Sequence, residues 1–316
     1  MRWLALILCL AALPLAAQEA PDRAARAEVI QDAFQTWLDG LDGRGALAVR
    51  YAGAPVSLTG HGLNPDDPQP IASLSKAITA TCAMRLVAEG AWTLETTAGD
   101  VLGGTSAATL GELITHTAGL WPDSTQGWSN VLLPLNRLRA PEVGAKALAR
   151  GADPGLRGTY LYSNENYAVL GDMIAAQTGT SYEAACRARV LAPAGVPAAP
   201  APAVAPMLAW GGWQMAPDDY AAFLHHWYRA PDPAPRHHFG AGYWYGTGMF
   251  VRPWGAGYNF WHFGGYCIPG QLEVGSFAVS WRGEWSVVAV YDRCITESQM
   301  ISLDAVLAAA AHRVLP

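Results

Sequence analysis

Hydrophobic positions along this chain fall into three zones. Near the N-terminus, residues 22–41 have helical spacing, and residues 46–51 and 55–59 alternate as two short strands across an Ala-Gly turn. The middle zone, from about 71 to 196, is rich in helical patterns. Those patterns cover residues 78–87, 110–115, 141–150, 166–177 and 182–191.

The third zone follows an Ala- and Pro-rich stretch, residues 197–206, which indicates a boundary or a surface excursion. A helical pattern at 217–228 comes next, and then an aromatic, Gly-rich region with strand character. Its clearest hairpin joins residues 272–281 to 285–291 across Arg282-Gly283. Strands at both ends with helices between them predict one α+β sheet domain interrupted by a helical insertion.

These patterns assign residues 18–80 and 206–316 to the sheet domain and residues 81–205 to the helical insertion, with the active site where the two meet. The chain has 316 residues, of which 51% are hydrophobic and 15% charged, so it can bury a sizeable core and intrinsic disorder is excluded. A net charge of −6 without clustered basic residues excludes a nucleic-acid partner.

The first 17 residues are expected to be a leader rather than part of the fold. Met1-Arg2 is followed by an apolar run to Leu15 and then by Ala16-Ala17, the pattern of a secretory signal peptide. The run is shorter than the roughly 20 residues that span a bilayer, and no other stretch is long and apolar enough. We therefore expect an exported protein, periplasmic or secreted, without a membrane span after cleavage.

Four cysteines remain beyond the leader: Cys82, Cys186, Cys267 and Cys294. None has the spacing of a zinc site, so no metal is predicted. In the predicted 272–291 hairpin, Cys294 falls opposite the approach to the first strand, which makes Cys267–Cys294 a disulfide candidate. Cys82 and Cys186 lie in helical patterns, where two buried free thiols are the simpler alternative to a second disulfide.

The chemistry begins at Ser73 and Lys76, three residues apart at the start of a helical pattern. That spacing places both side chains on one side of a helix. A serine hydroxyl becomes a nucleophile when a base removes its proton, and a neutral lysine one turn away can act as that base. Alone, this motif also fits an ordinary N-terminal serine beside a solvated lysine.

Two further motifs follow in order. Tyr162-Ser163-Asn164 precedes a helical pattern, and His262-Phe263-Gly264-Gly265 lies where a strand begins. A cationic neighbour that lowers the pKa of Tyr162 enables it to relay a proton, and Asn164 can orient a substrate amide. Each also has a structural reading: a packed tyrosine before a turn, and a glycine bend beside a core histidine.

Together, the three motifs resemble the serine β-lactamase and penicillin-binding-protein superfamily, which uses S-x-x-K, a tyrosine or serine motif and K-T-G in this order. The Y-x-N form is similar to the class C branch, which also contains D-alanyl-D-alanine carboxypeptidases, D-aminopeptidases and esterases. Two neighbouring segments add to the resemblance, residues 113–120 (LITHTAGL) and 154–164 (PGLRGTYLYSN). The resemblance covers most of the chain beyond the leader, and it implies an antiparallel sheet flanked by helices with an inserted helical domain.

The resemblance also implies roles. Ser73 is the acylated nucleophile, Lys76 and Tyr162 share the proton transfers, and Asn164 binds the substrate's amide side. The backbone N–H groups of Ser73 and Gly265 form the oxyanion hole, beside Gly264 and His262 on the substrate side. His116 lies within a motif read as structural. No cofactor is implied, the partner is a small ester, amide or peptide, and the oligomeric state is left open.

The third motif departs from the β-lactamase pattern, because His262 stands where that pattern has lysine. Only two lysines occur in the chain, and Lys146 lies far upstream of this motif. A fixed cation for a substrate carboxylate is therefore missing, and we expect the charge of His262 to change instead, from neutral at pH 7.5 to positive near pH 5.5, about its ordinary pKa of 6.5.

Three functions stay open: an exported serine hydrolase for neutral esters or amides, a β-lactamase or carboxypeptidase acting on cell-wall peptides, and a silent binding protein. Tryptophans 244, 254 and 261 near the third motif fit a cleft lining or the sheet core. The pairs His225-His226 and His237-His238 lack a ligand pattern and are expected at the surface.

Overall fold

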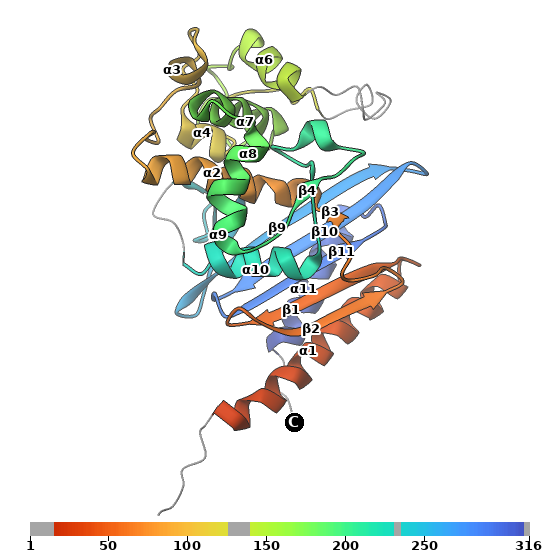
Figure 1. Ribbon diagram of the computed structural model, residues 1–316. Coiled ribbons are helices and arrows are strands. Elements are labelled where there is room, and N and C mark those ends of the chain that lie inside the picture. The colour runs from red at the N-terminus through yellow and green to blue at the C-terminus, as the bar shows by residue number, and fades with distance from the viewer. Residues whose placement is uncertain (1–15, 126–139, 231–234, 313–316) are drawn as a thin grey trace, which may run out of the picture.

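The computed structural model describes residues 16–125, 140–230 and 235–312. Most of the expected leader, residues 1–15, lies outside this part of the chain. The described residues form a large antiparallel sheet with helices on both faces, and further helices gathered beyond one end of it (Figure 1). The expected fold class, a mixed antiparallel sheet and helix architecture, is confirmed.

The sheet has eight strands in the order β2-β1-β11-β10-β9-β8-β7-β6, so strands from the two ends of the chain lie side by side (Figure 1). Both predicted hairpins are present, one within residues 45–61 and one turning at Arg282-Gly283. The strands are β1 (Gly45–Tyr51), β2 (Ala54–His61), β6 (His237–His238), β7 (Trp244–Gly246), β8 (Met249–Trp254), β9 (Gly257–Ile268), β10 (Leu272–Trp281) and β11 (Trp285–Tyr291).

The predicted helices form close to their expected bounds, but three helices in the described part of the chain were missed: two short ones at residues 98–102 and 192–194, and a longer one at residues 297–312. In the longest of these, Leu303, Leu307 and Ala311 are buried at helical spacing, so its pattern was present in the sequence. The helices are α1 (Ala16–Asp39), α2 (Ser75–Ala88), α3 (Ala98–Leu102), α4 (Leu110–Ile114), α6 (Ala140–Arg150), α7 (Asn164–Thr178), α8 (Tyr182–Cys186), α9 (Ala192–Ala194), α10 (Pro217–Trp227) and α11 (Glu297–His312).

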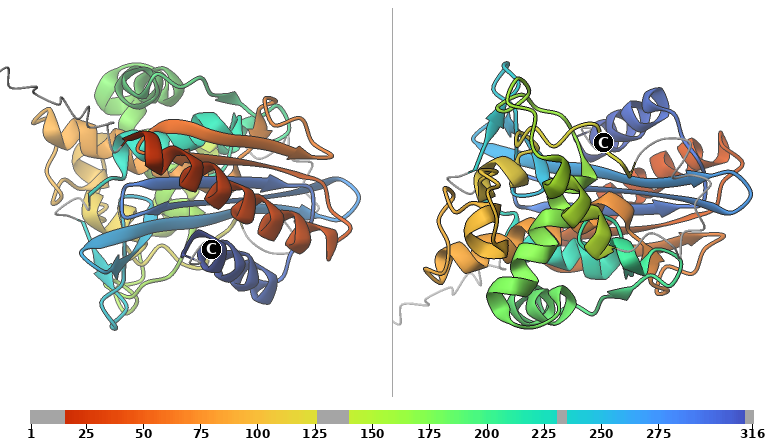
Figure 2. Two further views of the ribbon diagram at one scale, coloured as in Figure 1. Left: turned by 90° about the horizontal axis from the view of Figure 1, so that it is seen from below. Right: turned by 90° about the horizontal axis from the view of Figure 1, so that it is seen from above.

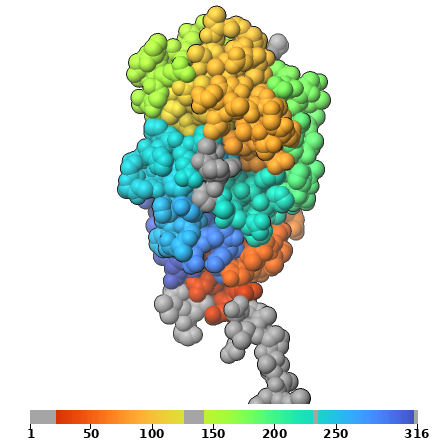
Figure 3. Space-filling view, turned by 90° about the vertical axis from the view of Figure 1, so that its left-hand side faces the viewer, coloured from red at the N-terminus to blue at the C-terminus, as the bar shows by residue number. Residues whose placement is uncertain are grey.

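Each face of the sheet is covered by its own core. Helices α1 and α11 lie side by side across one face (Figure 2), where Phe34 and Leu307 pack against Phe277. On the other face, α10 and the helices around α2 and α7 share a second core, to which Phe223 and Tyr167 contribute. In the space-filling view, the segments around α2 to α4 sit above the strands of residues 237–291 (Figure 3). The division at residues 80 and 206 stays a prediction.

The Ala- and Pro-rich stretch, expected to be a boundary or a surface excursion, runs along the surface with part of its side chains in the core: Pro197, Pro202 and Ala203 are exposed. Ala201 and Val204 within it are buried, with exposed fractions of 1% and 0%. The segment also contributes β4 (Ala199–Pro200) to a small sheet with β3 (Gln69–Pro70) and β5 (Trp213–Met215).

Two disulfides are present. Cys82 on α2 is bonded to Cys186 at the end of α8, which replaces the alternative of two free thiols. Cys267 on β9 is bonded to Cys294, the pair expected from the hairpin. None of the described helices combines the length and the apolar character needed to cross a bilayer.

Candidate active site

Ser73 and Lys76 lie next to each other because a short turn leads directly into a helix. Ser73 sits in a 3-10 turn (Ala72–Leu74), and α2 begins two residues later. Ala72, the residue before Ser73, has a φ of 45°, a left-handed conformation that costs energy for a residue other than glycine. The Nζ atom of Lys76 donates a hydrogen bond of 3.0 Å to the Oγ of Ser73.

Lys76 is fully buried, with an exposed fraction of 0%. Its Nζ also donates to the carbonyl of Trp210 at 2.9 Å, which fixes the direction of the side chain. Desolvation lowers the pKa of Lys76 to about 7, although the negative charge of Asp123 opposes this shift. A large share of Lys76 is therefore neutral at neutral pH, as a base that receives the proton of Ser73 must be.

Tyr162 lies over the same pair. The Nζ of Lys76 is 4.8 Å from the centre of the Tyr162 ring, and an interaction with the Ser73 side chain acts to lower the pKa of Tyr162. Desolvation raises the pKa of Tyr162 well above its ordinary value, and the charge of Asp123 raises it further. The expectation that a cationic neighbour lowers this pKa is wrong, because desolvation raises the pKa by more than the opposing interaction with Ser73 lowers it. Tyr162 therefore holds its proton, and Lys76 is the better resting base.

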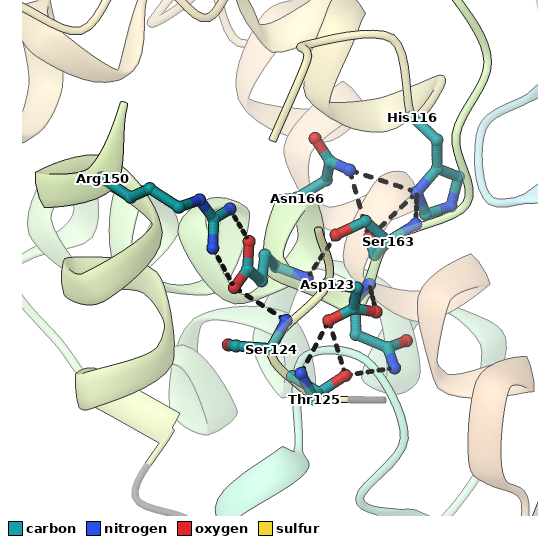
Figure 4. Close-up of polar contacts among 9 residues, drawn as sticks. His116, Asp123, Ser124, Thr125, Arg150, Ser163 and Asn166 are labelled. Atoms are coloured by element: carbon teal, nitrogen blue, oxygen red, sulfur yellow. Dashed lines mark hydrogen bonds and ion pairs between the residues drawn. The ribbon is translucent and has the colours of Figure 1, made fainter. Parts of the chain in front are cut away.

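Asn164 is held by the segment that follows α4. Its backbone N–H donates to Asp123 at 2.8 Å, and its Nδ2 donates to the Oγ1 of Thr125 at 2.8 Å. The carboxylate of Asp123 also accepts from the N–H and the Oγ1 of Thr125 (Figure 4). Among the residues that the structure describes, the buried Oδ1 of Asn164 has no hydrogen-bond partner, so this acceptor is unsatisfied there.

Next to this loop in the chain, the buried carboxylate of Glu165 forms an ion pair. Glu165 has an exposed fraction of 0% and pairs with Arg150 on α6, while it accepts from the N–H of Ser124 (Figure 4). Ser163 caps α7 by accepting from the N–H of Glu165 at 3.3 Å. The loop of Tyr162 to Asn164 is thus fixed from several sides.

His116 supports the same loop. Its Nδ1 accepts from the N–H of Ser163 at 3.2 Å, and its ring lies 4.5 Å from that of Tyr162, centre to centre. Desolvation, together with the charge of Lys76, holds the pKa of His116 well below its ordinary value, so the ring is neutral. These contacts agree with the structural role expected for this residue.

His262 faces the site as a buried, neutral ring. Its exposed fraction is 3%, its Nδ1 donates to the carbonyl of Phe263, and its Nε2 is 3.4 Å from the hydroxyl of Tyr245. Desolvation and the charge of Lys76 lower its pKa to about 3. The expectation that His262 becomes positive near pH 5.5 is therefore wrong, because the surrounding protein disfavours its charged form.

The two glycines of the third motif have different surroundings. A Cβ on Gly264 would lie 2.6 Å from the carbonyl oxygen of Ile71 and 2.8 Å from the backbone nitrogen of Ser73, so only glycine allows this close approach. A Cβ on Gly265 would meet nothing nearer than 3.5 Å. Gly264 thus allows β9 to approach the turn that carries Ser73. Ser73, Gly264 and Gly265 line one cavity.

A cavity of about 680 Å³ includes Ser73, Tyr162, His262 and Gly265. Of the three tryptophans considered, Trp261 lines it, Trp244 is buried in the core, and Trp254 is exposed and stacks on His312. In the paired histidines, His226 and His238 are exposed while His225 and His237 are half-buried. Across the described ranges, no three His, Cys, Asp or Glu side chains are grouped to hold a metal ion.

Three contributors to this geometry were not found from the sequence: Asp123, Thr125 and the carbonyl of Trp210. Asp123 follows the LITHTAGL segment by three residues, which is the one signal that could have drawn attention to it. The role of a backbone carbonyl such as that of Trp210 cannot be predicted from the sequence, because every residue type has one.

The sequence matches a known protein family. Residues 34–295 match the model of a family described as Beta-lactamase. A curated relative, penicillin-binding protein 4 of Amycolatopsis lactamdurans, is 32% identical over 136 residues. That alignment covers 39% of this chain and 33% of the relative, so the chain matches about a third of the relative's length.

Solved structures show the same fold at low sequence identity. FmtA from Staphylococcus aureus superposes with a TM-score of 0.72 at 15% identity, covering 90% of this chain and 87% of that one. A class C β-lactamase from Rhodobacter sphaeroides gives 0.69 at 17% identity, covering 89% and 98%. A D-amino acid amidase from Ochrobactrum anthropi SV3 gives 0.69 at 18%, with the same coverage.

Proposed function

The chain belongs to the beta-lactamase family, and from this premise we propose that it is a serine hydrolase that cleaves an ester or amide through an acyl-enzyme on Ser73. The observation that carries the proposal is the contact between Lys76 and Ser73. A fully buried lysine whose pKa is lowered to about 7 donates a 3.0 Å hydrogen bond to a half-buried serine that lines a cavity. Burying an amine costs free energy, which a structural lysine has no reason to incur.

The proposed steps follow from the contacts. Neutral Lys76 takes the proton of Ser73 as its Oγ attacks the substrate carbonyl, and the N–H groups of Ser73 and Gly265 stabilise the oxyanion. Tyr162, which keeps its proton, donates to the leaving group and is reprotonated through Lys76. Water then attacks the acyl-enzyme and gives a proton to the same groups, the bond between the acyl carbon and the Oγ of Ser73 breaks, and the proton returns to that Oγ as the acid leaves. The Oδ1 of Asn164, unsatisfied among the described residues, accepts an N–H when the substrate is an amide.

A neutral substrate fits this site better than the β-lactam antibiotics or cell-wall peptides of the rival reading, which carry a carboxylate. His262 is neutral, with its pKa lowered to about 3, so it offers no charge to a carboxylate. The silent binding protein is the third alternative. The Lys76–Ser73 contact and the low pKa of Lys76 favour turnover, because a protein that only binds does not require an activated serine.

One panel of substrates separates the three readings. Purified protein and its Ser73→Ala variant are assayed with a neutral aryl ester, a D-amino amide and a chromogenic cephalosporin. We expect ester or amide turnover that exceeds cephalosporin turnover and disappears in Ser73→Ala. Cephalosporin turnover above both would favour the β-lactamase, and stable labelling by a fluorescent penicillin without any turnover would favour the binding protein.

We further propose that residues 1–17 are a cleaved leader and that the protein is exported. The two disulfides support an oxidising compartment, since they persist mainly outside the cytosol. Mass spectrometry of protein recovered from the periplasm or the medium tests this. A mature N-terminus near Gln18 is the expected result, and protein retained in the cytosol with Met1 would contradict it.

A further inference from the structure

Two glycines face each other on the side of the sheet covered by α11. Gly265 of β9 pairs in register with Gly275 of β10. Side chains alternate between the faces of a strand, so both glycines share a face with Phe263 and Phe277, which pack with the α1 and α11 side. The layer of side chains on this face is therefore interrupted, and the gap adjoins the proposed oxyanion donor, Gly265.

The gap opens into a hollow whose lining is mainly apolar but also includes Arg252, Arg293, Glu297 and Asp304. The ring of Tyr291 lies so close to Gly275 that a Cβ there would overlap it, so Tyr291 occupies the floor of the hollow. Phe263 and Trp261 of β9 line one side, and Met300 and Ile301 of α11 line another. The hollow is continuous with Ser73, because all these residues line the same cavity of about 680 Å³, a volume typical of small-molecule sites.

The second half of β9 leaves this hollow open to the nucleophile. β8 pairs with β9 only as far as Trp261, and from His262 onward β9 pairs with β10 alone. No strand therefore separates the Ser73 side of β9 from the α11 side at Gly265 among the residues that the structure describes. A substrate bound at Ser73 can extend past this edge into the hollow.

The guanidinium groups that line the hollow already have carboxylate partners. Arg252 makes two hydrogen bonds of 3.0 Å to Asp304, and Arg293 lies 3.1 Å from Asp292. Ile301, in contrast, is 62% exposed, a large apolar side chain on the wall that core packing does not explain. The walls thus offer apolar contact, and their positive charges are compensated.

From these observations we propose that the hollow between β9, β10 and α11 binds an uncharged apolar arm, alkyl or aryl, of the ester or amide that is cleaved at Ser73. This inference rests on the proposed function and adds the substrate class. The arm belongs to either the acyl or the leaving group of the substrate, and the two series described next distinguish them.

The test is the dependence of kcat/KM on chain length. One series of esters lengthens the acyl chain with the alcohol fixed, and the other lengthens the alcohol with the acyl group fixed. Burying one methylene corresponds to about fourfold in kcat/KM when burial is complete, so a partly open hollow gives about two- to fourfold per added carbon. We expect this slope in one series, and a clearly smaller slope in Ile301→Asp.

Leu58→Asp is the matched control. Leu58 is also an exposed large apolar residue, at 37%, and it lies on β2 at the far edge of the sheet order from β9. This variant should keep the wild-type slope. Slopes that are flat in both series for an active enzyme, or a wild-type slope in Ile301→Asp, would overturn the inference. A small fluorophosphonate that does not use the hollow tests Ser73 separately, and failure of both labelling and turnover would overturn the proposed function as well.

Discussion

Replacing Asp123 by asparagine tests how the loop before Asn164 serves the site. Asp123 is 5% exposed, and its carboxylate accepts at least three hydrogen bonds, from the N–H of Asn164 and from the N–H and Oγ1 of Thr125. In Asp123→Asn, one oxygen becomes an NH2 group that cannot accept, so at least one of these donors loses its partner. A hydrogen bond to a charged group contributes about 1.5–3 kcal/mol, so the free energy of unfolding should fall by about 2 kcal/mol.

The same change removes a negative charge that raises the pKa of Lys76. The other titratable groups around Lys76 stay as they are: His116 and His262 are neutral, and Tyr162 and Tyr167 hold their protons because desolvation raises the pKa of each. The pKa of Lys76 therefore falls below its wild-type value of about 7. Since neutral Lys76 is the proposed base, kcat/KM should begin to rise at a lower pH in the variant.

The assay is kcat/KM for a neutral ester from about pH 5 to about pH 9, beside a thermal melt of each protein. Asp153→Asn is the matched control, because Asp153 is an exposed aspartate that also accepts a backbone N–H, that of Gly155 at 2.8 Å. Asp153→Asn should leave the acidic limb of the kcat/KM–pH profile unchanged. If the Asp123→Asn protein is folded but the acidic limb of its kcat/KM–pH profile stays in place, or moves to higher pH, the electrostatic role of Asp123 is refuted.

Two further predictions concern the proton relay and His262. Lys76→Ala and Tyr162→Phe should each lower kcat by about a hundredfold or more, and their effects should not multiply in the double variant, because the two groups act as a unit; a fully multiplicative loss would contradict a shared relay. The preference of the wild type for neutral over carboxylate-bearing substrates should be flat between about pH 5.5 and about pH 7.5, since the pKa of His262 is lowered to about 3. A preference that narrows toward acidic pH in the wild type would show that His262 gains charge after all.

Sequence patterns predicted the parts of this molecule that depend on local spacing. The 272–291 hairpin follows from alternation around Arg282-Gly283, and the meeting of Ser73 with Lys76 follows from one turn of chain. The three motifs, far apart in the chain, could be placed in one site only through resemblance to a family.

What the sequence left out depends on packing between distant segments. The burial that lowers the pKa values of Lys76 and His262 comes from residues distant in the chain. Examples are Trp210, whose carbonyl accepts from Lys76, and Tyr245, whose hydroxyl contacts the Nε2 of His262. The hollow at Gly265 requires the register of β9 against β10, which no single strand pattern specifies. The missed helix α11 is different, because its apolar spacing was present in the sequence.

The central claim is that Ser73 is an acylated nucleophile activated by Lys76, and the most direct measurement is the site of covalent labelling. The protein is incubated with a small fluorophosphonate, its intact mass is measured by mass spectrometry, and a digest is analysed to locate the adduct. We predict a single adduct on the peptide that carries Ser73, at Ser73 and not at Ser75, whose buried Oγ is occupied by the N–H of Trp213 at 3.2 Å. The adduct should be absent from folded Ser73→Ala and form more slowly in Lys76→Ala. An adduct at another residue, or full esterase activity in Ser73→Ala, would contradict the account.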